Sequence, residues 1–241
     1  MMKTIILLTG VADQQMALST LLRAHNPALA FRGATTADEL AAIEPEVLRD
    51  ARLLSFTTSV IVPESTLAAL GYGAYNFHPG PPQYPGWAPA HFALYDGARM
   101  FGATAHAMAG RVDAGPIIGV ESFIIPDKIS VRGLEQIAYV RLAHLFWRMS
   151  RDLACDPAPL AELPIAWCGH KSTKQMYREM CDLPPGISAT ELARRIRAFH
   201  DDFRGIPLTF ALHGTRFQLA TEAAQVAAAP EVVSPPLAVA S

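Results

Sequence analysis

The first half of the chain alternates short apolar runs with amphipathic stretches, and this alternation constrains the fold most. The expected strands are Ile5–Leu8, Leu29–Arg32, Leu53–Thr57 and Ala74–His78. The expected helices between them are Asp13–Ala24, with Asp13 as its N-cap, Ala37–Ile43 and Glu64–Leu70. Strand–helix–strand units connect by right-handed crossovers and build parallel sheets. We therefore expect an α/β fold with a Rossmann-like, mainly parallel sheet flanked by helices.

The second half predicts a continuation of this sheet and then a smaller element. A helix is expected over Ala88–Gly97, paired strands over Phe101–Met108 and Pro116–Ile125, and a long amphipathic helix over Val131–Leu153. A small C-terminal α+β element is expected to hold a helix over Ala189–Phe199 and a hairpin around His213-Gly214-Thr215. Pro and Asp residues mark a linker after Cys155. The expected boundaries are 1–154 for the catalytic domain, 165–220 for the small subdomain and 221–241 for a flexible Ala/Pro/Val-rich tail.

Polar residues stand where one buried strand ends. Asn76 and His78 are two residues apart, so in a strand their side chains point to the same face. A stiff Pro-rich loop, 79–85, follows them. An amide N–H can stabilise a developing oxyanion, and an imidazole can carry a proton at neutral pH. Asp113 lies in a loop before another apolar run, where a carboxylate would orient His78 or a water molecule.

Four blocks in this order resemble one family. They are Asn76-Phe77-His78, Gly86 with Pro89, Gly102-Ala103-Thr104-Ala105-His106 and Asp113-Ala114-Gly115-Pro116-Ile117-Ile118. The set is similar to that of the formyltransferase superfamily, whose members act on 10-formyltetrahydrofolate. They include glycinamide ribonucleotide, methionyl-tRNA and sugar N-formyltransferases and formyltetrahydrofolate deformylase. The resemblance implies catalytic roles for Asn76, His78 and Asp113 and a folate formyl donor.

The resemblance also implies where the folate and the acceptor bind. Backbone groups near two loops would contact the folate, at Phe56, Val60, Ile61, Val62, Gly110 and Val112. The substrate side would hold Thr104, His106, Tyr84 and Trp87. A structural role for His106 is an equal alternative, and Tyr84 and Trp87 either stack on a ring or anchor the Pro-rich loop.

Two segments depart from the family pattern. The turn Gly10-Val11-Ala12-Asp13 lacks a Gly-rich phosphate cradle, which argues against a substrate phosphate at that point. Pro79-Gly80-Pro81-Pro82 replaces the Ser-Leu-Leu-Pro of many members. The formyltransferase-like portion of a hydrogenase-maturation protein has a similar Pro-rich segment, so a different donor or acceptor stays an open alternative.

Composition and charge argue against a nucleic acid, a membrane or a metal ion as a partner of this chain. The net charge of the 241 residues is -2 and the pI is near 6.4, so no basic field attracts a nucleic-acid backbone. The chain also stops where the tRNA-binding β-barrel of methionyl-tRNA formyltransferase would begin, and tRNA is not expected as a substrate. No apolar run approaches the roughly 20 residues of a membrane span. Three cysteines without C-x-x-C spacing indicate free thiols in a reducing cytoplasm and no metal site.

The sequence thus predicts transfer of a formyl group from 10-formyltetrahydrofolate to the amine of a small molecule, an amino sugar or an amino acid derivative. The alternative is a deformylase that hydrolyses the same donor to formate, although deformylases usually carry an N-terminal regulatory domain. A third class, a non-catalytic folate-binding or scaffold protein, is disfavoured by the intact Asn76, His78 and Asp113. The hydrophobic C-terminal element favours a homodimer.

Overall fold

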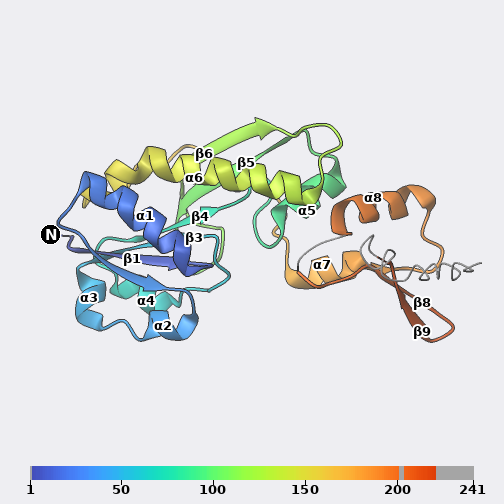
Figure 1. The fold of residues 1–241 in the computed structure, drawn as a ribbon, viewed down its shortest axis with the longest axis horizontal. Coiled ribbons are helices and arrows are strands. Elements are labelled where there is room, and N and C mark those ends of the chain that lie inside the picture. Colours follow the sequence, from blue (N-terminus) through green and yellow to red (C-terminus); the bar gives the residue numbers. More distant parts are fainter. Residues whose placement is uncertain (1, 201–203, 221–241) are drawn as a thin grey trace, which may run out of the picture. The chain divides into compact units, whose positions relative to one another are not determined.

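A six-stranded sheet organises the first part of the chain. The computed structural model describes residues 2–200 and 204–220. The strands are β1 (Thr4–Thr9), β2 (Ala30–Ala34), β3 (Ala51–Phe56), β4 (Ala74–His78), β5 (Met100–Ala107) and β6 (Ile117–Ile124), in the spatial order β2-β1-β3-β4-β5-β6 (Figure 1).

The first four strands are parallel, and β5 and β6 are antiparallel to their neighbours. This mainly parallel sheet confirms the predicted fold class. In the antiparallel pair β4–β5, Asn76 lies opposite His106 and His78 lies opposite Thr104. Side chains of directly opposed residues are neighbours on one face of a sheet. The register therefore brings the Asn76–His78 block into contact with the block that ends at His106.

Helices cover both faces of the sheet (Figure 1). The helices are α1 (Ala12–His25), α2 (Ala37–Ala41), α3 (Pro45–Arg49), α4 (Glu64–Ala69), α5 (Pro89–Asp96) and α6 (Val131–Cys155). Alternate strand residues point to opposite faces. Ile5 and Leu7 belong to a core cluster that contains residues of α1 and α6, whereas Ile6 and Leu8 belong to a second cluster with residues of α2 and α3. Burial on both faces explains the continuous apolar run of this strand.

Three local predictions differ from the structure. Helix α1 begins at Ala12 with Val11 as its N-cap and no side-chain cap, so the prediction of Asp13 as N-cap is wrong. Helix α3 was not predicted, since five residues are too few for a periodic pattern. In the predicted amphipathic helix, now α6, Val140 recurs at the spacing of the apolar face but is 62% exposed.

Arg52 shows why the start of β3 was predicted too late. A charged residue next to an apolar run is typical of a strand boundary, yet Arg52 is fully buried inside β3. Its guanidinium donates hydrogen bonds to the carbonyls of Tyr72, Asp152, Leu153 and Ala158 at 2.9–3.3 Å. Carbonyls in the last turn of a helix lack the usual helical donor, and Arg52 donates to two of them at the end of α6. The carbonyl of Asp152 also accepts from the Asp156 N–H at 3.0 Å, so Leu153 depends more on Arg52.

The chain divides into two units between Tyr177 and Arg178. The division lies later than the expected end of the first domain at 154. Ala158, Leu160 and Leu163 hydrogen-bond to residues of β3, β4 and β6, which ties the segment after α6 to the first unit. The later elements are α7 (Lys174–Cys181), β7 (Asp182–Leu183), α8 (Ala189–Phe199), β8 (Thr209–Leu212) and β9 (Thr215–Gln218). The second unit contains a three-stranded sheet and the predicted helix and hairpin. The tail expected at 221–241 lies outside the described residues.

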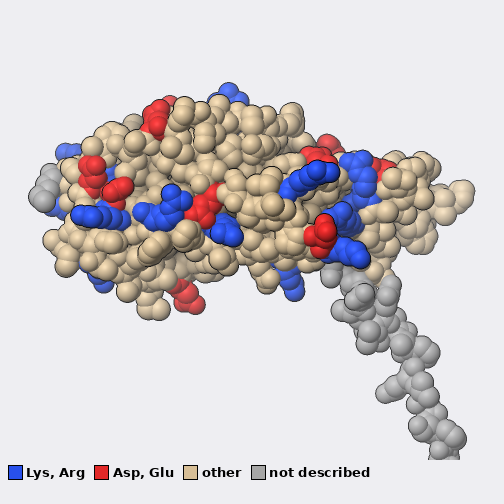
Figure 2. Space-filling model, turned by 90° about the horizontal axis from the view of Figure 1, so that it is seen from above, with Lys and Arg blue, Asp and Glu red and all other residues tan. Residues whose placement is uncertain are grey.

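Three further features of the described residues are the length and polarity of the helices, the charges on the surface and the state of the cysteines. None of the helices in the described ranges combines the length and apolar character that crossing a bilayer requires. On the face drawn in Figure 2, basic and acidic side chains lie interspersed. The three cysteines, Cys155, Cys168 and Cys181, are free thiols.

Candidate active site

A pocket of about 360 Å³ opens at the carboxyl ends of β3 and β4, where parallel sheets bind ligands. Its polar wall comes from β4, β5 and the loop after β5, and the other walls from the β3–α4 loop and residues 171–173. Residues that line it include Val60, Ile61, Val62, Leu67, Asn76, His78, Gly86, Trp87, His106, Met108, Gly110, Arg111, Val112, Asp113, Lys171, Ser172 and Thr173.

His106 links Asn76 to Asp113 within this pocket. The Nδ1 atom of His106 lies 2.8 Å from the carbonyl oxygen of Ala107, so Nδ1 carries a hydrogen and donates it. The Nε2 atom lies 3.1 Å from Asn76 Nδ2 and 3.3 Å from Asp113 Oδ1. It accepts from the Asn76 amide when the ring is neutral and donates to Asp113 when the ring is protonated. The orientation of the Asn76 amide and the charge of this ring are therefore coupled.

His78 lies between Asp113 and the Pro-rich loop. Its Nε2 atom is 3.1 Å from the carbonyl oxygen of Tyr84, and its Nδ1 atom is 3.6 Å from Asp113 Oδ2. Burial lowers the pKa of His78, and the opposing attraction of Asp113 does not restore it to its ordinary value. The imidazole is therefore neutral at pH 7 and has one basic nitrogen.

Asp113 is held in an unusual backbone conformation. Its φ is 48°, a left-handed value that costs energy in a residue other than glycine. Its Oδ2 atom accepts a hydrogen bond from the Gly86 N–H at 2.8 Å. Burial alone would raise the pKa of Asp113, but the hydrogen bond from His106, the charge of His78 and the Gly86 N–H together lower it to about 2. A carboxylate that is ionised at neutral pH thus faces both imidazoles.

The Pro-rich loop packs tightly on this cluster. A Cβ atom on Gly80 would lie 2.6 Å from His78 Nε2 and 2.8 Å from Pro89 Cβ, so only glycine fits there. The Thr104 hydroxyl donates to the Gly80 carbonyl at 2.8 Å and ties the loop to β5. The loop therefore fixes the position of the His78 ring from one side.

Residues 163–173, which we call the strap, hold the loops that carry the site. Ser172 Oγ donates to the carbonyls of Trp87 and Pro85 at 2.6 and 3.2 Å. The Lys171 Nζ donates to the carbonyl of Val112 at 3.0 Å. The strap thus connects the Pro-rich loop to the loop that contains Asp113.

The structure brings together most of the residues that the sequence singled out. Asn76, His78, Asp113, His106 and Trp87 line the pocket, as do Val60, Ile61, Val62, Gly110 and Val112.

Phe56, Tyr84 and Thr104 do not line the pocket. The Phe56 side chain is 1% exposed and packs in the core against Phe77 and Phe146. The Tyr84 ring lies 6.3 Å from Phe101, and burial raises the pKa of its hydroxyl to about 12. Thr104 is fully buried under the Pro-rich loop. These three side chains anchor the walls of the pocket rather than face its interior.

Sequence reasoning missed the strap and its Trp167. The expected linker and small subdomain divided this segment, and a single Trp between Pro and Gly gives no periodic signal. The indole lies edge-to-face on both imidazoles, with ring centroids 5.7 Å from His78 and 5.1 Å from His106. The described residues hold no cluster of three or more His, Cys, Asp or Glu that could bind a metal ion.

Comparisons with known proteins agree with this geometry. Residues 11–138 match the family model described as Formyl transferase. The methionyl-tRNA formyltransferase of Methylococcus capsulatus is 28% identical over 192 residues, which are 78% of this chain and 58% of that protein. The enzyme of the same name from Staphylococcus epidermidis is 36% identical over 109 residues, 40% of this chain and 35% of its own length. The chain thus spans between about a third and three fifths of these curated relatives.

Solved structures share the fold at low identity. A sugar N-formyltransferase from Shewanella superposes with a TM-score of 0.74 at 15% identity, over 92% of this chain and 98% of that one. An N-formyltransferase from Helicobacter canadensis, solved in complex with folinic acid and dTDP-3-aminofucose, gives a TM-score of 0.63 at 16% identity over 90% and 86% of the two chains. The family model covers more than half of the sequence, and this chain belongs to the formyl transferase family.

Proposed function

We propose that this protein transfers the formyl group of 10-formyltetrahydrofolate to the primary amine of a small molecule, an amino sugar in the first place. The observation that carries the proposal is the meeting of Asn76, His78 and Asp113 on one pocket. These side chains come from a strand end and a loop 35 residues further along the chain. Such convergence of an amide, a neutral imidazole and a carboxylate suits acyl transfer to an amine.

The apolar end of the pocket suits the donor. Val60, Ile61, Val62 and Met108 line it beside backbone of the loop 108–113. Flat heterocycles bind in apolar clefts where a few backbone groups fix their orientation. We assign the pterin ring of the folate to this end. The Helicobacter enzyme, named as a complex with folinic acid, supports the choice of a folate.

The reaction balances without a further reagent. The amine nitrogen attacks the formyl carbon, the carbonyl oxygen becomes an oxyanion, and the bond from that carbon to N10 of the folate breaks. One proton leaves the amine and one arrives at N10, which yields a formamide and tetrahydrofolate. Asn76 Nδ2 donates to the oxyanion, and neutral His78 takes the amine proton. Asp113, ionised at every pH above about 2, stabilises the imidazolium that results.

The acceptor approaches from the side of Trp87 and residues 171–173 in this proposal. Trp87 and Thr173 supply an aromatic ring and a hydroxyl to the lining there, beside Lys171. Aromatic faces and hydroxyls are typical of sugar recognition, which needs stacking and hydrogen bonds together. The sugar N-formyltransferase fold of the Shewanella protein supports an amino sugar over an amino acid derivative.

A donor assay with an amine panel tests the proposal. The protein is incubated with 10-formyltetrahydrofolate and nucleotide-linked amino sugars, free amino sugars, amino acids or methionyl-tRNA, and the tetrahydrofolate formed is followed by absorbance. Formylation is verified by the mass of the product. We expect turnover with an amino sugar and none for His78→Ala.

Each contrary result selects another function. Equal turnover without any amine would identify a deformylase. Folate binding without turnover would indicate a non-catalytic folate-binding protein, and turnover with methionyl-tRNA alone would assign the activity of the curated relatives. The expected boundaries, 1–154 for the catalytic domain and 165–220 for a subdomain, stay a prediction beside the division between Tyr177 and Arg178. Limited proteolysis distinguishes them by whether the first cut falls between 154 and 165 or near 178.

A further inference from the structure

Trp167 packs against the two imidazoles of the site from outside the residues that line the pocket. It lies in the strap, 89 residues after His78 in the chain. Its Nε1–H donates to the carbonyl of Gly115 at 2.9 Å, which fixes the indole relative to the loop that carries Asp113. The position of the ring is therefore set by a directional hydrogen bond as well as by packing.

The indole contacts the two imidazoles at the same time. The planes of Trp167 and His78 meet at 74°, and those of Trp167 and His106 at 86°. Edge-to-face pairs of this kind are worth about 0.5–1.5 kcal/mol beyond the area that they bury. A single side chain thus constrains the rotation of both imidazole rings.

The neighbouring backbone holds the strap in place around this ring. The Cys168 N–H donates to the Pro82 carbonyl at 3.1 Å, and the Leu163 N–H donates to the Ile117 carbonyl at 2.7 Å. A Cβ atom on Gly169 would lie 1.6 Å from the Gln83 carbonyl oxygen, so the strap touches the Pro-rich loop directly. Trp167 is consequently not a loose surface ring.

The side chains of the site are nearly inaccessible to solvent. His78, His106 and Asp113 are 5%, 3% and 6% exposed although all three line the pocket. The titratable groups that act on His78 are Asp113 from the loop after β5 and His106 from β5, and Tyr84 contributes its backbone carbonyl. Removal of an apolar wall from a buried imidazole admits water and favours its charged form.

We propose that Trp167 is a positioning residue of the active site, which fixes the orientation of the His78 and His106 imidazoles and keeps water from the side that they share. It touches neither the formyl carbon nor the amine in this assignment. Two experiments test this proposal. The first, a titration of His78 by NMR (the titration arm), is independent of the proposed function. The second, a measurement of formyl transfer (the activity arm), rests on it.

The titration arm follows the imidazole resonances of the intact protein by NMR as a function of pH. The His78 resonance is assigned by its loss in His78→Ala. In Trp167→Ala we expect the titration midpoint of His78 to move upward, toward the ordinary value of about 6.5. Trp167→Phe keeps an aromatic wall but not the hydrogen bond to Gly115, and we expect a smaller upward shift.

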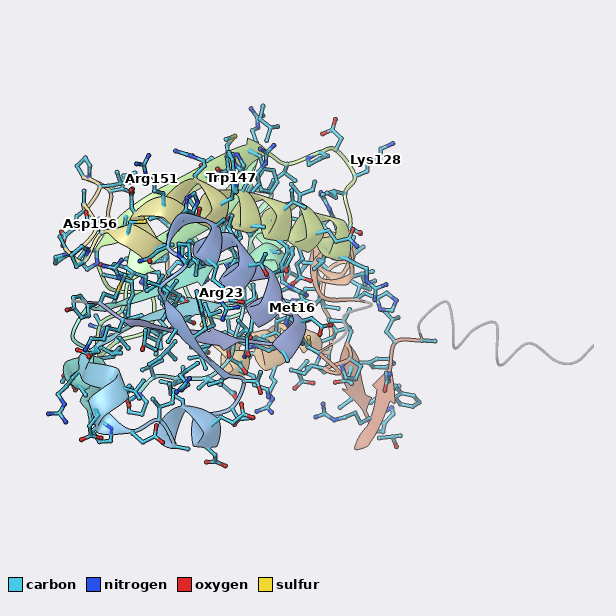
Figure 3. The ribbon with its side chains drawn as sticks, turned by 60° about the vertical axis from the view of Figure 1, so that its left-hand side comes forward. Met16, Arg23, Lys128, Trp147, Arg151 and Asp156 are labelled. Carbon is cyan, nitrogen blue, oxygen red and sulfur yellow. The ribbon has the colours of Figure 1, made fainter. Side chains whose placement is uncertain are left out.

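The matched control is Trp147→Phe. Trp147 lies on α6, is 58% exposed and stacks on His144 with ring centroids 5.5 Å apart, outside the residues that line the pocket (Figure 3). This variant should leave the His78 midpoint unchanged. An unchanged midpoint in Trp167→Ala would overturn the proposal. If that variant does not fold, an unchanged midpoint in Trp167→Phe would overturn it equally.

The activity arm measures kcat and kcat/KM for formyl transfer across pH. A displaced catalytic imidazole lowers kcat by about 100-fold for a shift near 1 Å. We expect a loss of that order in Trp167→Ala, with the acid limb of kcat/KM moved to higher pH and the KM for the donor changed only a few-fold. A loss equal at every pH would indicate a structural role alone and refute the assignment. If the unmodified protein has no turnover, the proposed function fails while the titration arm still decides the role of Trp167.

Discussion

Replacement of Gly80 by alanine should displace the His78 imidazole. The added Cβ atom would lie 2.6 Å from His78 Nε2, whereas ordinary van der Waals contacts are 3.4–4 Å. The ring or the loop must therefore move by about 1 Å. Escape of the methyl group in the other direction is blocked, because Pro89 Cβ and Cγ lie at 2.8 and 2.9 Å.

The loop has little freedom to absorb this shift. The carbonyl of Gly80 accepts from the buried Thr104 hydroxyl at 2.8 Å, and the Tyr84 N–H donates to the Pro81 carbonyl at 2.9 Å. We therefore expect the imidazole to move. A displacement of about 1 Å of a reacting group costs about 100-fold in rate, equivalent to about 2.7 kcal/mol of barrier. Overpacking should also lower the free energy of unfolding by about 1–3 kcal/mol.

The assay compares single-turnover formyl transfer in the unmodified protein, Gly80→Ala and a control, Gly133→Ala. Gly133 lies in the first turn of α6, where the nearest contact is the Ile129 side chain at 3.0 Å, which can rotate away. The control should keep full activity. Donor affinity, measured by fluorescence quenching, should change little in both variants. Full activity in a folded Gly80→Ala protein would refute the argument, since it would mean that the position of His78 does not limit the reaction.

Three further predictions concern the same network and the core. Asn76→Ala should lower kcat by about 10²–10³-fold, because it removes the proposed oxyanion donor. His106→Ala should lower kcat by less, because it removes only the hydrogen-bond partner of Asn76. Equal losses in single-turnover measurements would contradict this order. Asp113 has a pKa lowered from 3.8 to about 2, so its contribution of about 2 kcal/mol to stability is complete above pH 4 and is lost as the pH falls toward 2. Denaturant titrations should therefore show a smaller acid destabilisation in Asp113→Asn than in the unmodified protein, and parallel curves would exclude the ionised carboxylate as a stabilising group. Arg52→Ala should cost at least about 3 kcal/mol of unfolding free energy by urea titration, because it removes the guanidinium donor from four carbonyls, one of which, that of Asp152, also accepts from the Asp156 N–H. A cost below about 1 kcal/mol would be inconsistent with the buried geometry.

Local patterns predicted the sheet and the strand that carries Asn76 and His78 well. Both faces of β1 are buried, so its apolar run identified it without ambiguity. The spacing of Asn76 and His78 set them on one face of β4, and the structure places both on the pocket. Such predictions succeed because side-chain periodicity reports which faces of a strand or helix are covered.

Long-range polar contacts escaped prediction. Arg52 was excluded from its strand because its partners, the carbonyls of residues 152, 153 and 158, lie about 100 residues away in the chain. Thr104 was expected on the substrate side, since alternation gave its face correctly but not the Pro-rich loop that covers it. The periodicity of a segment indicates that one of its faces is covered, but it does not identify the segment that covers it.

The strap shows what determines the rigidity of this site. Asp113 and Gly86 lie in loops, and loops are more mobile than the elements that they connect. Here the Pro-rich loop receives hydrogen bonds from Cys168 and Ser172, and the loop of Asp113 receives them from Trp167 and Lys171. Most of these bonds involve backbone carbonyls, which any residue offers, so the sequence carries no signal of them. The sheet places Asn76, His78 and His106, but the geometry between His78 and Asp113 depends on how firmly one segment, 163–173, holds two loops together.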